Sequence, residues 1–167
     1  HTLAAPLRAG GVFAGIVETI AGLGGTLPMV VVTNKPTPLA RAVLHAAGLL
    51  PWLSGVHGAD TAAQRKPSPS LLLAAAQALG VAPARLVMVG DARPDLLAAE
   101  AAGCPAALVA WGYGGHAAAN GLTRAWRLAT PQQLLRPALG AGAARGELIV
   151  KTRESPSPSP GRPPCST

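Results

Sequence analysis

Residues 86–95 read Leu-Val-Met-Val-Gly-Asp-Ala-Arg-Pro-Asp, an apolar run that becomes polar within one step. The four apolar residues predict a buried parallel strand. Gly90 allows a sharp turn, and Pro94 suits the first turn of a helix, where its missing N–H costs nothing. Gly103 is a natural stop for that helix. The stretch therefore predicts a strand, a tight turn and a helix, in that order.

Two carboxylates follow the predicted strand. Asp91 comes directly after the turn, and Asp95 lies in the first helical turn, where the helix dipole favours an anion. Ligands of open α/β sheets bind outside the carboxyl ends of the strands, and paired carboxylates there suit a hard cation such as Mg²⁺. The alternative is that both are only turn and cap residues. Spacing alone leaves the two interpretations open.

Strand and helix patterns alternate along the rest of the chain. Apolar runs predict strands over 29–32, 106–110 and 127–129, with a short edge strand near Val56. Helical spacing predicts helices over 12–23, 37–48, 70–80 and 131–139. Short connections between them predict parallel β-α-β units with right-handed crossovers. We therefore expect an α/β domain over residues 1–139, followed by a disordered Ser/Pro-rich tail over 140–167.

Composition and charge restrict the class of protein. Apolar residues make up 49% of the 167, enough for one domain with a sizeable core. The net charge of +7 is spread along the chain without a Lys/Arg cluster among aromatics, so nucleic acid is not an expected partner. No apolar run has the length of a membrane span, and no secretory signal is visible, so a cytoplasmic protein without membrane contact is expected. Cys104, beside Gly103 and Pro105, is interpreted as a small core residue.

Three polar groups follow apolar segments or precede a helix. They are Thr33-Asn34-Lys35, Lys66-Pro67, and Asp91 with Asp95. In a parallel sheet the two strand ends face one crevice, which the loop before the third helix could reach. Together the groups supply hydroxyl and amide donors, an ammonium and two carboxylates, which are the groups needed to hold a phosphoryl group.

With these three groups in this order, the sequence resembles the haloacid dehalogenase superfamily of hydrolases, in its phosphoglycolate phosphatase-like branch. The resemblance covers roughly residues 12–139. It rests on residues 30–36 for the second motif, Lys66-Pro67-Ser68-Pro69 with the helix up to Gly80 for the third, residues 87–103 for the fourth, and Trp111-Gly112-Tyr113-Gly114 for a glycine-tyrosine loop. Ala92 departs from the serine often found after Gly-Asp in this branch.

The resemblance implies a three-layer Rossmann-like parallel sheet with flanking helices, incomplete at its N-terminal side. It implies Mg²⁺-dependent hydrolysis of a small phosphorylated metabolite, by default phosphoglycolate, through an aspartyl-phosphate. Thr33 and Asn34 would bind the phosphoryl group. Lys66 would be the catalytic lysine, binding the phosphate and stabilising the nucleophile. Asp91 would be a metal ligand, and Asp95 a ligand or its neighbour.

One part of the family pattern is missing. None of the seven acidic residues belongs to an Asp-x-Asp pair, so the Asp-x-Asp-Gly-Thr motif that supplies the nucleophile, the acid/base and a metal ligand is absent from the sequence. The helical cap that usually follows it is absent too. In the family fold, the strand that carries this motif lies between the second-motif and fourth-motif strands. Those two strands are therefore expected to close up or to stay partly unpaired. A fragment or incomplete gene product is the expected explanation, with a pseudoenzyme as the alternative.

Two other functions fit parts of the sequence. Residues 112–117 match the G-x-G-x-x-A pattern of a dinucleotide-binding module, but no acidic residue occurs between Glu100 and Glu147 to contact a ribose. The missing motif and the Ser-Pro tail would also suit a non-catalytic interaction protein. Reading the coding sequence upstream of His1 distinguishes an enzyme from that alternative.

Overall fold

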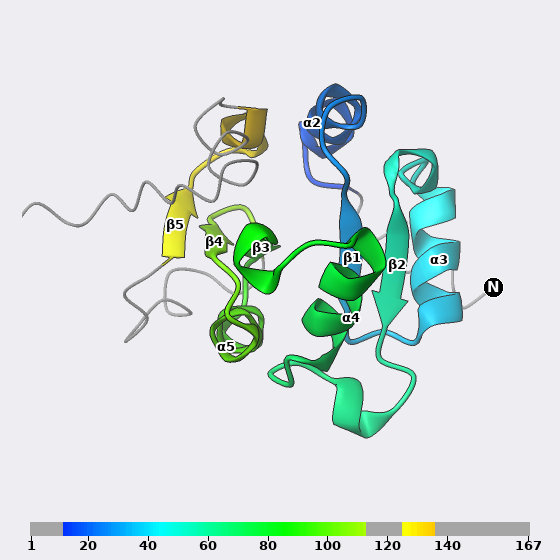
Figure 1. Ribbon diagram of the computed structural model, residues 1–167. Helices are drawn as coiled ribbons and strands as arrows, with labels where there is room; N and C mark the ends of the chain where they lie inside the picture. Colours follow the sequence, from blue (N-terminus) through cyan, green and yellow to red (C-terminus); the bar gives the residue numbers. More distant parts are fainter. Residues whose placement is uncertain (1–11, 113–124, 136–167) are drawn as a thin grey trace, which may run out of the picture.

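The computed structural model describes residues 12–112 and 125–135 and has an α/β architecture (Figure 1). Its helices are α2 (Ile16–Leu23), α3 (Thr37–Ala46), α4 (Ser70–Leu79) and α5 (Arg93–Ala102), and its strands are β1 (Val30–Thr33), β2 (Gly55–Gly58), β3 (Met88–Gly90), β4 (Ala106–Val109) and β5 (Ala125–Leu128). Short 3₁₀ turns connect them: η1 (Leu50–Trp52), η2 (Ala62–Gln64), η3 (Pro83–Arg85) and η5 (Pro131–Leu135).

The described strands form two separate parallel sheets. One is the pair β1-β2, in which Val31 lies opposite Val56. The other has the order β3-β4-β5, with Val89 opposite Ala107 and Ala107 opposite Trp126. Helix α3 connects β1 to β2 and α5 connects β3 to β4, so each sheet contains one of the predicted β-α-β units. Figure 1 shows α3 beside β2, α4 in front of β1, and α5 below β3 and β4.

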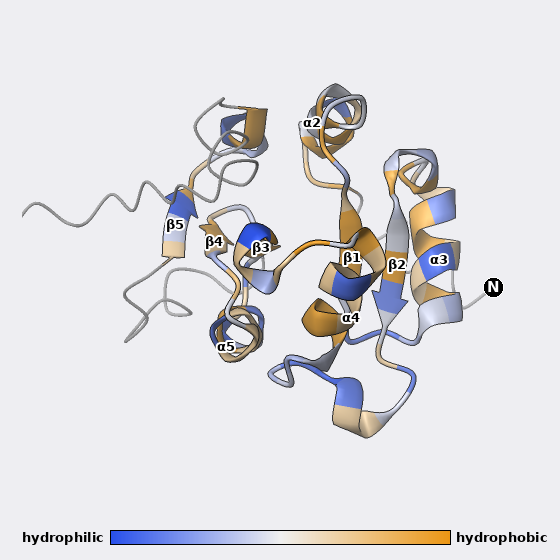
Figure 2. Cartoon of the chain, in the orientation of Figure 1, coloured by the Kyte–Doolittle hydropathy of each residue, from blue (hydrophilic) through white to orange (hydrophobic). Residues whose placement is uncertain are grey.

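A shared core holds the two sheets together. Leu72 of α4 packs in one buried cluster with Met88 of β3 and Leu96 of α5, and Val32 of β1 packs against that cluster. Figure 2 shows strongly hydrophobic, orange segments of β1 and α4 next to each other near the middle of the view. Many small alanines in the cluster allow helix and strand to approach closely. Helix α4 thus links two sheets that share no hydrogen-bonded ladder within the described residues.

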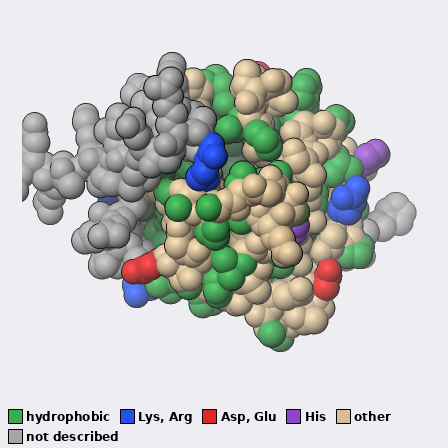
Figure 3. Space-filling model, viewed as in Figure 1, with side chains coloured by type: hydrophobic (Ala, Val, Ile, Leu, Met, Phe, Trp, Pro, Cys, Tyr) green, Lys and Arg blue, Asp and Glu red, His purple; other side chains and the backbone are tan. Residues whose placement is uncertain are grey.

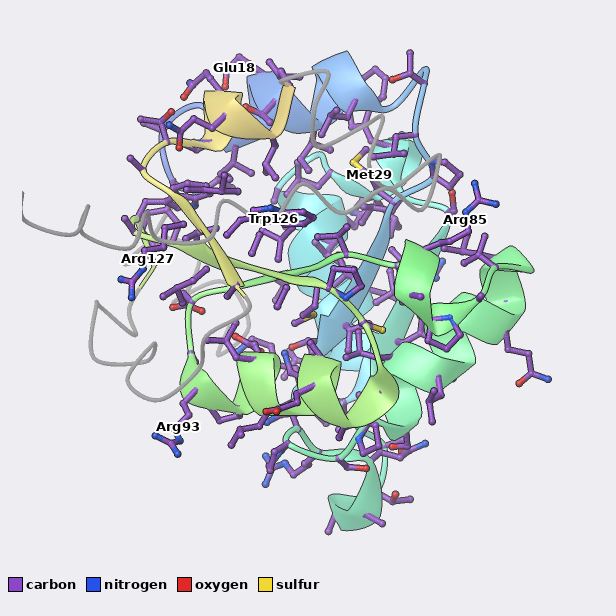
Figure 4. The ribbon with its side chains drawn as sticks, turned by 60° about the vertical axis from the view of Figure 1, so that its left-hand side comes forward. Glu18, Met29, Arg85, Arg93, Trp126 and Arg127 are labelled. Atoms are coloured by element: carbon purple, nitrogen blue, oxygen red, sulfur yellow. The ribbon has the colours of Figure 1, made fainter. Side chains whose placement is uncertain are left out.

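Side chains of β5 alternate in direction along the strand. Trp126 points into the molecule and Arg127 points away from it in Figure 4. Trp126 packs against a smaller cluster formed by Ala107, Val109 and Leu128.

The predicted strands are present, but two of them are less buried than predicted. Residues 86–89 were expected to be a fully buried strand, yet 40% of the Val89 surface is exposed and only Met88 is buried. The residues of β1 are all half-buried. The reason is topological, because β1 and β3 each have a strand neighbour on one side only within the described part. Of the two outcomes expected for these strands, closing up or staying partly unpaired, the described part of the chain shows the second.

Two helix predictions need correction. The helix predicted over 12–23 begins at Ile16, because Gly15 adopts a left-handed conformation with φ 82° and leaves Val12 outside the helix. The helix predicted over 131–139 is a 3₁₀ turn over Pro131–Leu135, and residues 136–139 lie outside the described residues. The tail over 140–167 and residues 113–117 of the glycine-rich loop also lie outside them.

Charged side chains are sparse on the molecular surface. Figure 3 shows the Lys and Arg side chains of one face standing apart from one another, without a basic patch. Among the described helices, none combines the length and the apolar character that a membrane crossing requires.

Candidate functional site

The Lys66 side chain joins the two sheets at the carboxyl ends of β1 and β3. Its Nζ donates to Asp95 Oδ1 at 2.6 Å and to the carbonyl oxygen of Val32 at 3.1 Å. Only 10% of the Lys66 side chain and 9% of the Asp95 side chain are exposed. Lys66 thus contacts the end of β1 in one sheet and the first turn of α5, the helix that follows β3 of the other sheet.

The backbone of Lys66 is fixed by the side chain of Asn34. The Lys66 N–H donates to Asn34 Oδ1 at 2.7 Å, and Asn34 Nδ2 donates to the Lys66 carbonyl at 3.3 Å. The Asn34 side chain therefore pairs with both the N–H and the carbonyl of Lys66, as the backbone of a neighbouring strand would. The sequence placed Asn34 and Lys66 at one site without indicating this contact.

Asp95 makes a second contact at the start of α5. Its Oδ2 accepts from the Ala92 N–H at 3.1 Å, which satisfies one of the N–H groups that a helix N-terminus leaves unpaired. Ala92 has no side-chain acceptor, so the reciprocal contact of a full capping box cannot form. Both Asp95 oxygens are engaged, one by an ammonium and one by the backbone. Asp95 is therefore a cap residue, and its role as a metal ligand or the neighbour of one stays a prediction.

Gly90 leaves the space that Asp95 occupies. A Cβ on Gly90 would lie 2.5 Å from Asp95 Cβ and 2.6 Å from Asp95 Oδ2. Because the Asp95 Cβ is fixed by the backbone of α5, the clash cannot be relieved by a side-chain rotation alone. The glycine at this turn is thus required by the close approach of Asp95.

Replacing Gly90 with alanine should lower the free energy of unfolding by about 2 kcal/mol, through overpacking and displacement of Asp95 from Lys66. Urea unfolding measures the change. Gly25→Ala is the matched control, since a Cβ at Gly25 would meet nothing within 4 Å. Equal stabilities of the two variants would contradict this account of Gly90.

Asp91 is the second carboxylate of the predicted site. It is half-buried after β3, and its side chain packs directly over Gly112, where a Cβ would collide with it. Asp95 is engaged by Lys66 and Ala92, and the role of Asp91 as a metal ligand stays a prediction. Within residues 12–112 and 125–135, no three His, Cys, Asp or Glu side chains gather as a complete ligand set.

A hydrogen-bonded network supports the turn that follows β1. Thr33 Oγ1 accepts from the Lys35 N–H at 3.2 Å. Asp60 accepts from the Thr37 N–H at 2.7 Å and from Thr37 Oγ1 at 2.8 Å, so it caps α3 from the loop after β2. Its partner lies 23 positions away, and no local pattern signals such a contact.

Cys104 lies in the core, as expected. It is buried in the cluster with Leu72 and Met88, and burial raises the pKa of its thiol. A raised pKa keeps the thiol protonated and poorly nucleophilic. Cys104 is therefore a packing residue.

Comparison with known proteins identifies the family. Residues 4–103 match the haloacid dehalogenase-like hydrolases, and the chain belongs to that family. The parallel sheets with flanking helices agree with the fold that the resemblance implied.

Several relatives are phosphoglycolate phosphatases. The chain is 40% identical over 102 residues to that of Escherichia coli K12, which covers 60% of this chain and 40% of the relative. It is 45% identical over 101 residues to that of Neisseria meningitidis, covering 58% of this chain and 43% of the relative. Among solved structures, a predicted phosphoglycolate phosphatase from Haemophilus somnus superposes with a TM-score of 0.67 at 27% identity, covering 74% of this chain and 55% of that one. The chain spans about two fifths of the length of the curated relatives it matches.

Proposed function

We propose that this chain is the phosphate-binding part of a Mg²⁺-dependent phosphomonoester hydrolase of the phosphoglycolate phosphatase type. The nucleophile of its aspartyl-phosphate intermediate would come from residues outside the chain. The observation that supports this proposal best is the near-buried Lys66 ammonium, held between Asp95 and the Val32 carbonyl. The similarity to phosphoglycolate phosphatases supports the choice of substrate class.

The proposed roles follow from the donors of this site. An ammonium has three N–H groups, and the described contacts of Lys66 use two of them. The third would donate to a phosphoryl oxygen, while the ion pair with Asp95 would hold the Lys66 side chain in position. Thr33 and the backbone N–H groups of the turn at Asn34 would donate to the other oxygens. Asn34 would act mainly by holding the Lys66 backbone, and its predicted contact with phosphate stays a prediction.

Asp91 would hold the Mg²⁺ ion, and Asp95 would act on it indirectly through its contacts with Lys66 and Ala92. Bound Mg²⁺ would neutralise charge on the phosphoryl oxygens. A low-molecular-weight phosphate ester as substrate and a cytoplasmic location, without nucleic acid or membrane as partner, are part of the same proposal.

Two measurements on the purified chain test the proposal. Release of phosphate from 2-phosphoglycolate with Mg²⁺ is expected to be absent, because no nucleophile is present. Orthophosphate should nevertheless raise the melting temperature when Mg²⁺ is present, and Asp91→Asn should abolish this Mg²⁺-dependent shift. Glu100→Gln is the control, since Glu100 is exposed on α5. Phosphate release by the unaided chain, or an unchanged shift in Asp91→Asn, would overturn the assigned roles.

A further inference from the structure

Lys66 lies in a loop between β2 and α4, so neither a strand nor a helix fixes its position. We call residues 59–66 the lysine loop. In Figure 1 this segment extends below β2 and α4 before the chain enters α4. Loops that project from a sheet are more mobile than the elements they connect unless contacts hold them. The contacts that hold the two ends of the lysine loop therefore help to place the Lys66 ammonium.

The turn after β1 holds the start of the lysine loop. The Ala59 N–H donates to the carbonyl oxygens of Thr33 and Lys35, at 3.1 and 3.0 Å. Gly58 fits against the same turn, because a Cβ there would lie 2.6 Å from the Lys35 carbonyl oxygen. The Gly58 N–H also donates to Thr37 Oγ1 at 3.0 Å. The loop thus begins in fixed contact with the end of β1 and the start of α3.

Asp60 connects this turn with the rest of the lysine loop. Its carboxylate accepts from the N–H and the hydroxyl of Thr37. Its own N–H donates to Gln64 Oε1 at 3.0 Å, and the Thr61 N–H donates to the same oxygen at 2.9 Å. Gln64 thereby closes a ring two residues before Lys66. The Asp60 side chain holds the turn, while its backbone belongs to the ring that leads to the lysine.

We propose that Asp60 is a positioning residue, which fixes the Lys66 ammonium through the lysine loop. The other end of this loop is held by Asn34, which pairs with the Lys66 backbone. Both ends are therefore attached to one turn, residues 33–37. Without the Asp60 carboxylate, Lys66 would keep its contact with Asn34 but lose the support that precedes it. The ammonium would then occupy more than one position.

A helix cap alone does not account for this arrangement. Capping requires an acceptor for the first N–H groups of α3, which the N-cap residue itself usually supplies. Here the N-cap residue is Pro36, and the acceptor comes from Asp60, 23 positions after Thr37 and in the loop that carries Lys66. The start of α3 and the lysine loop are thus coupled through one carboxylate. The consequence for phosphate binding rests on the proposed function, whereas the positioning of Lys66 does not.

The test measures how well Lys66 is shielded, with Lys35 of the same molecule as the internal reference. The chain is treated with a limiting amount of acetic anhydride, and mass spectrometry of its digest gives the acetylation of Lys66 relative to Lys35. Lys35 is exposed, whereas only 10% of the Lys66 side chain is. Asp60→Ala should raise this ratio about tenfold, because a lost supporting contact displaces the group that it holds. The orthophosphate concentration that gives half of the Mg²⁺-dependent thermal shift should rise by a similar factor.

A conservative pair of variants tests the route through Thr37. Thr37→Val removes the hydroxyl that donates to Asp60, so it should raise the acetylation ratio as well. Thr37→Ser keeps the hydroxyl and should retain the wild-type ratio. Thr37→Val also decides the question if Asp60→Ala does not fold.

Gln133→Ala is the matched control for a general loss of stability. Gln133 Oε1 accepts from the Ala129 and Thr130 N–H groups, the same kind of ring that is present in the lysine loop, but next to β5. The variant should lower the melting temperature without changing the acetylation ratio or the half-saturating orthophosphate concentration.

Each outcome decides the proposal. A raised ratio in Asp60→Ala and Thr37→Val supports it when the two controls keep the wild-type ratio. A wild-type ratio in Asp60→Ala overturns it and leaves Asp60 as a helix cap alone, and an equal rise in Gln133→Ala overturns it too. If the wild-type chain shows no Mg²⁺-dependent shift with orthophosphate, the proposed function fails, while the acetylation ratio still decides whether Asp60 positions Lys66.

Discussion

Replacing Lys66 with methionine is expected to lower the free energy of unfolding by about 4 kcal/mol. The substitution keeps most of the length of the side chain but leaves the Asp95 carboxylate, 9% exposed, without its cation at 2.6 Å. It also removes the donor to the Val32 carbonyl, and with it a contact that joins the two sheets. Urea unfolding followed by circular dichroism measures the change, and the Mg²⁺-dependent shift with orthophosphate should disappear as well.

A second variant separates the cost of an unpaired charge from the loss of the contact. Lys66→Met combined with Asp95→Asn should regain about 2 kcal/mol, because the charge left behind in the single variant is removed. Lys35→Met is the surface control, since Lys35 is exposed and its described hydrogen bonds use only its backbone N–H and carbonyl. If Lys66→Met lowered the free energy of unfolding no more than Lys35→Met does, the ion pair would not hold the site together.

The order of strands and helices could be predicted from the sequence because it depends on local signals. Apolar runs bounded by turn residues located β1, β3 and β4, and Gly80 and Gly103 end α4 and α5 in the left-handed conformation that glycine favours. Burial was harder to predict. The apolar run at 86–89 is typical of a strand covered on both sides, but the exposure of Val89 depends on whether a neighbouring strand is present.

The residues of the candidate site could be named from the sequence, but their contacts could not. Lys66 and Asp95 are 29 positions apart, and nothing in either local pattern shows that they form an ion pair. The cap formed by Asp60 on Thr37 depends in the same way on how two loops meet. Such contacts are set by the packing of the sheets and helices, which places loops from distant parts of the chain side by side. The roles assigned to Thr33, Asn34 and Asp91 stay predictions.

Leu72 is expected to be the most sensitive apolar position, because it belongs to the element that links the two sheets. Leu72 of α4 is 2% exposed within the cluster that contains Met88, Leu96 and Leu108, and Val32 of β1 packs against the same cluster. Leu72→Ala should lower the free energy of unfolding by about 3 kcal/mol, from lost burial and the cavity left behind. The adjacent Leu73 is 43% exposed, so Leu73→Ala should change the free energy of unfolding only slightly.

The mode of unfolding should change together with the stability. Within the described residues β1 and β3 share no ladder, so their coupling relies on α4 and on Lys66. Weakening the α4 contact should let the β1-β2 pair open before the β3-β4-β5 sheet. Native-state hydrogen exchange in Leu72→Ala should then give a lower opening free energy for the amides of β2 than for those of β4, with Leu73→Ala retaining the wild-type difference. A uniform decrease in both sheets would show instead that they unfold as one unit, and that contacts other than those of α4 couple them.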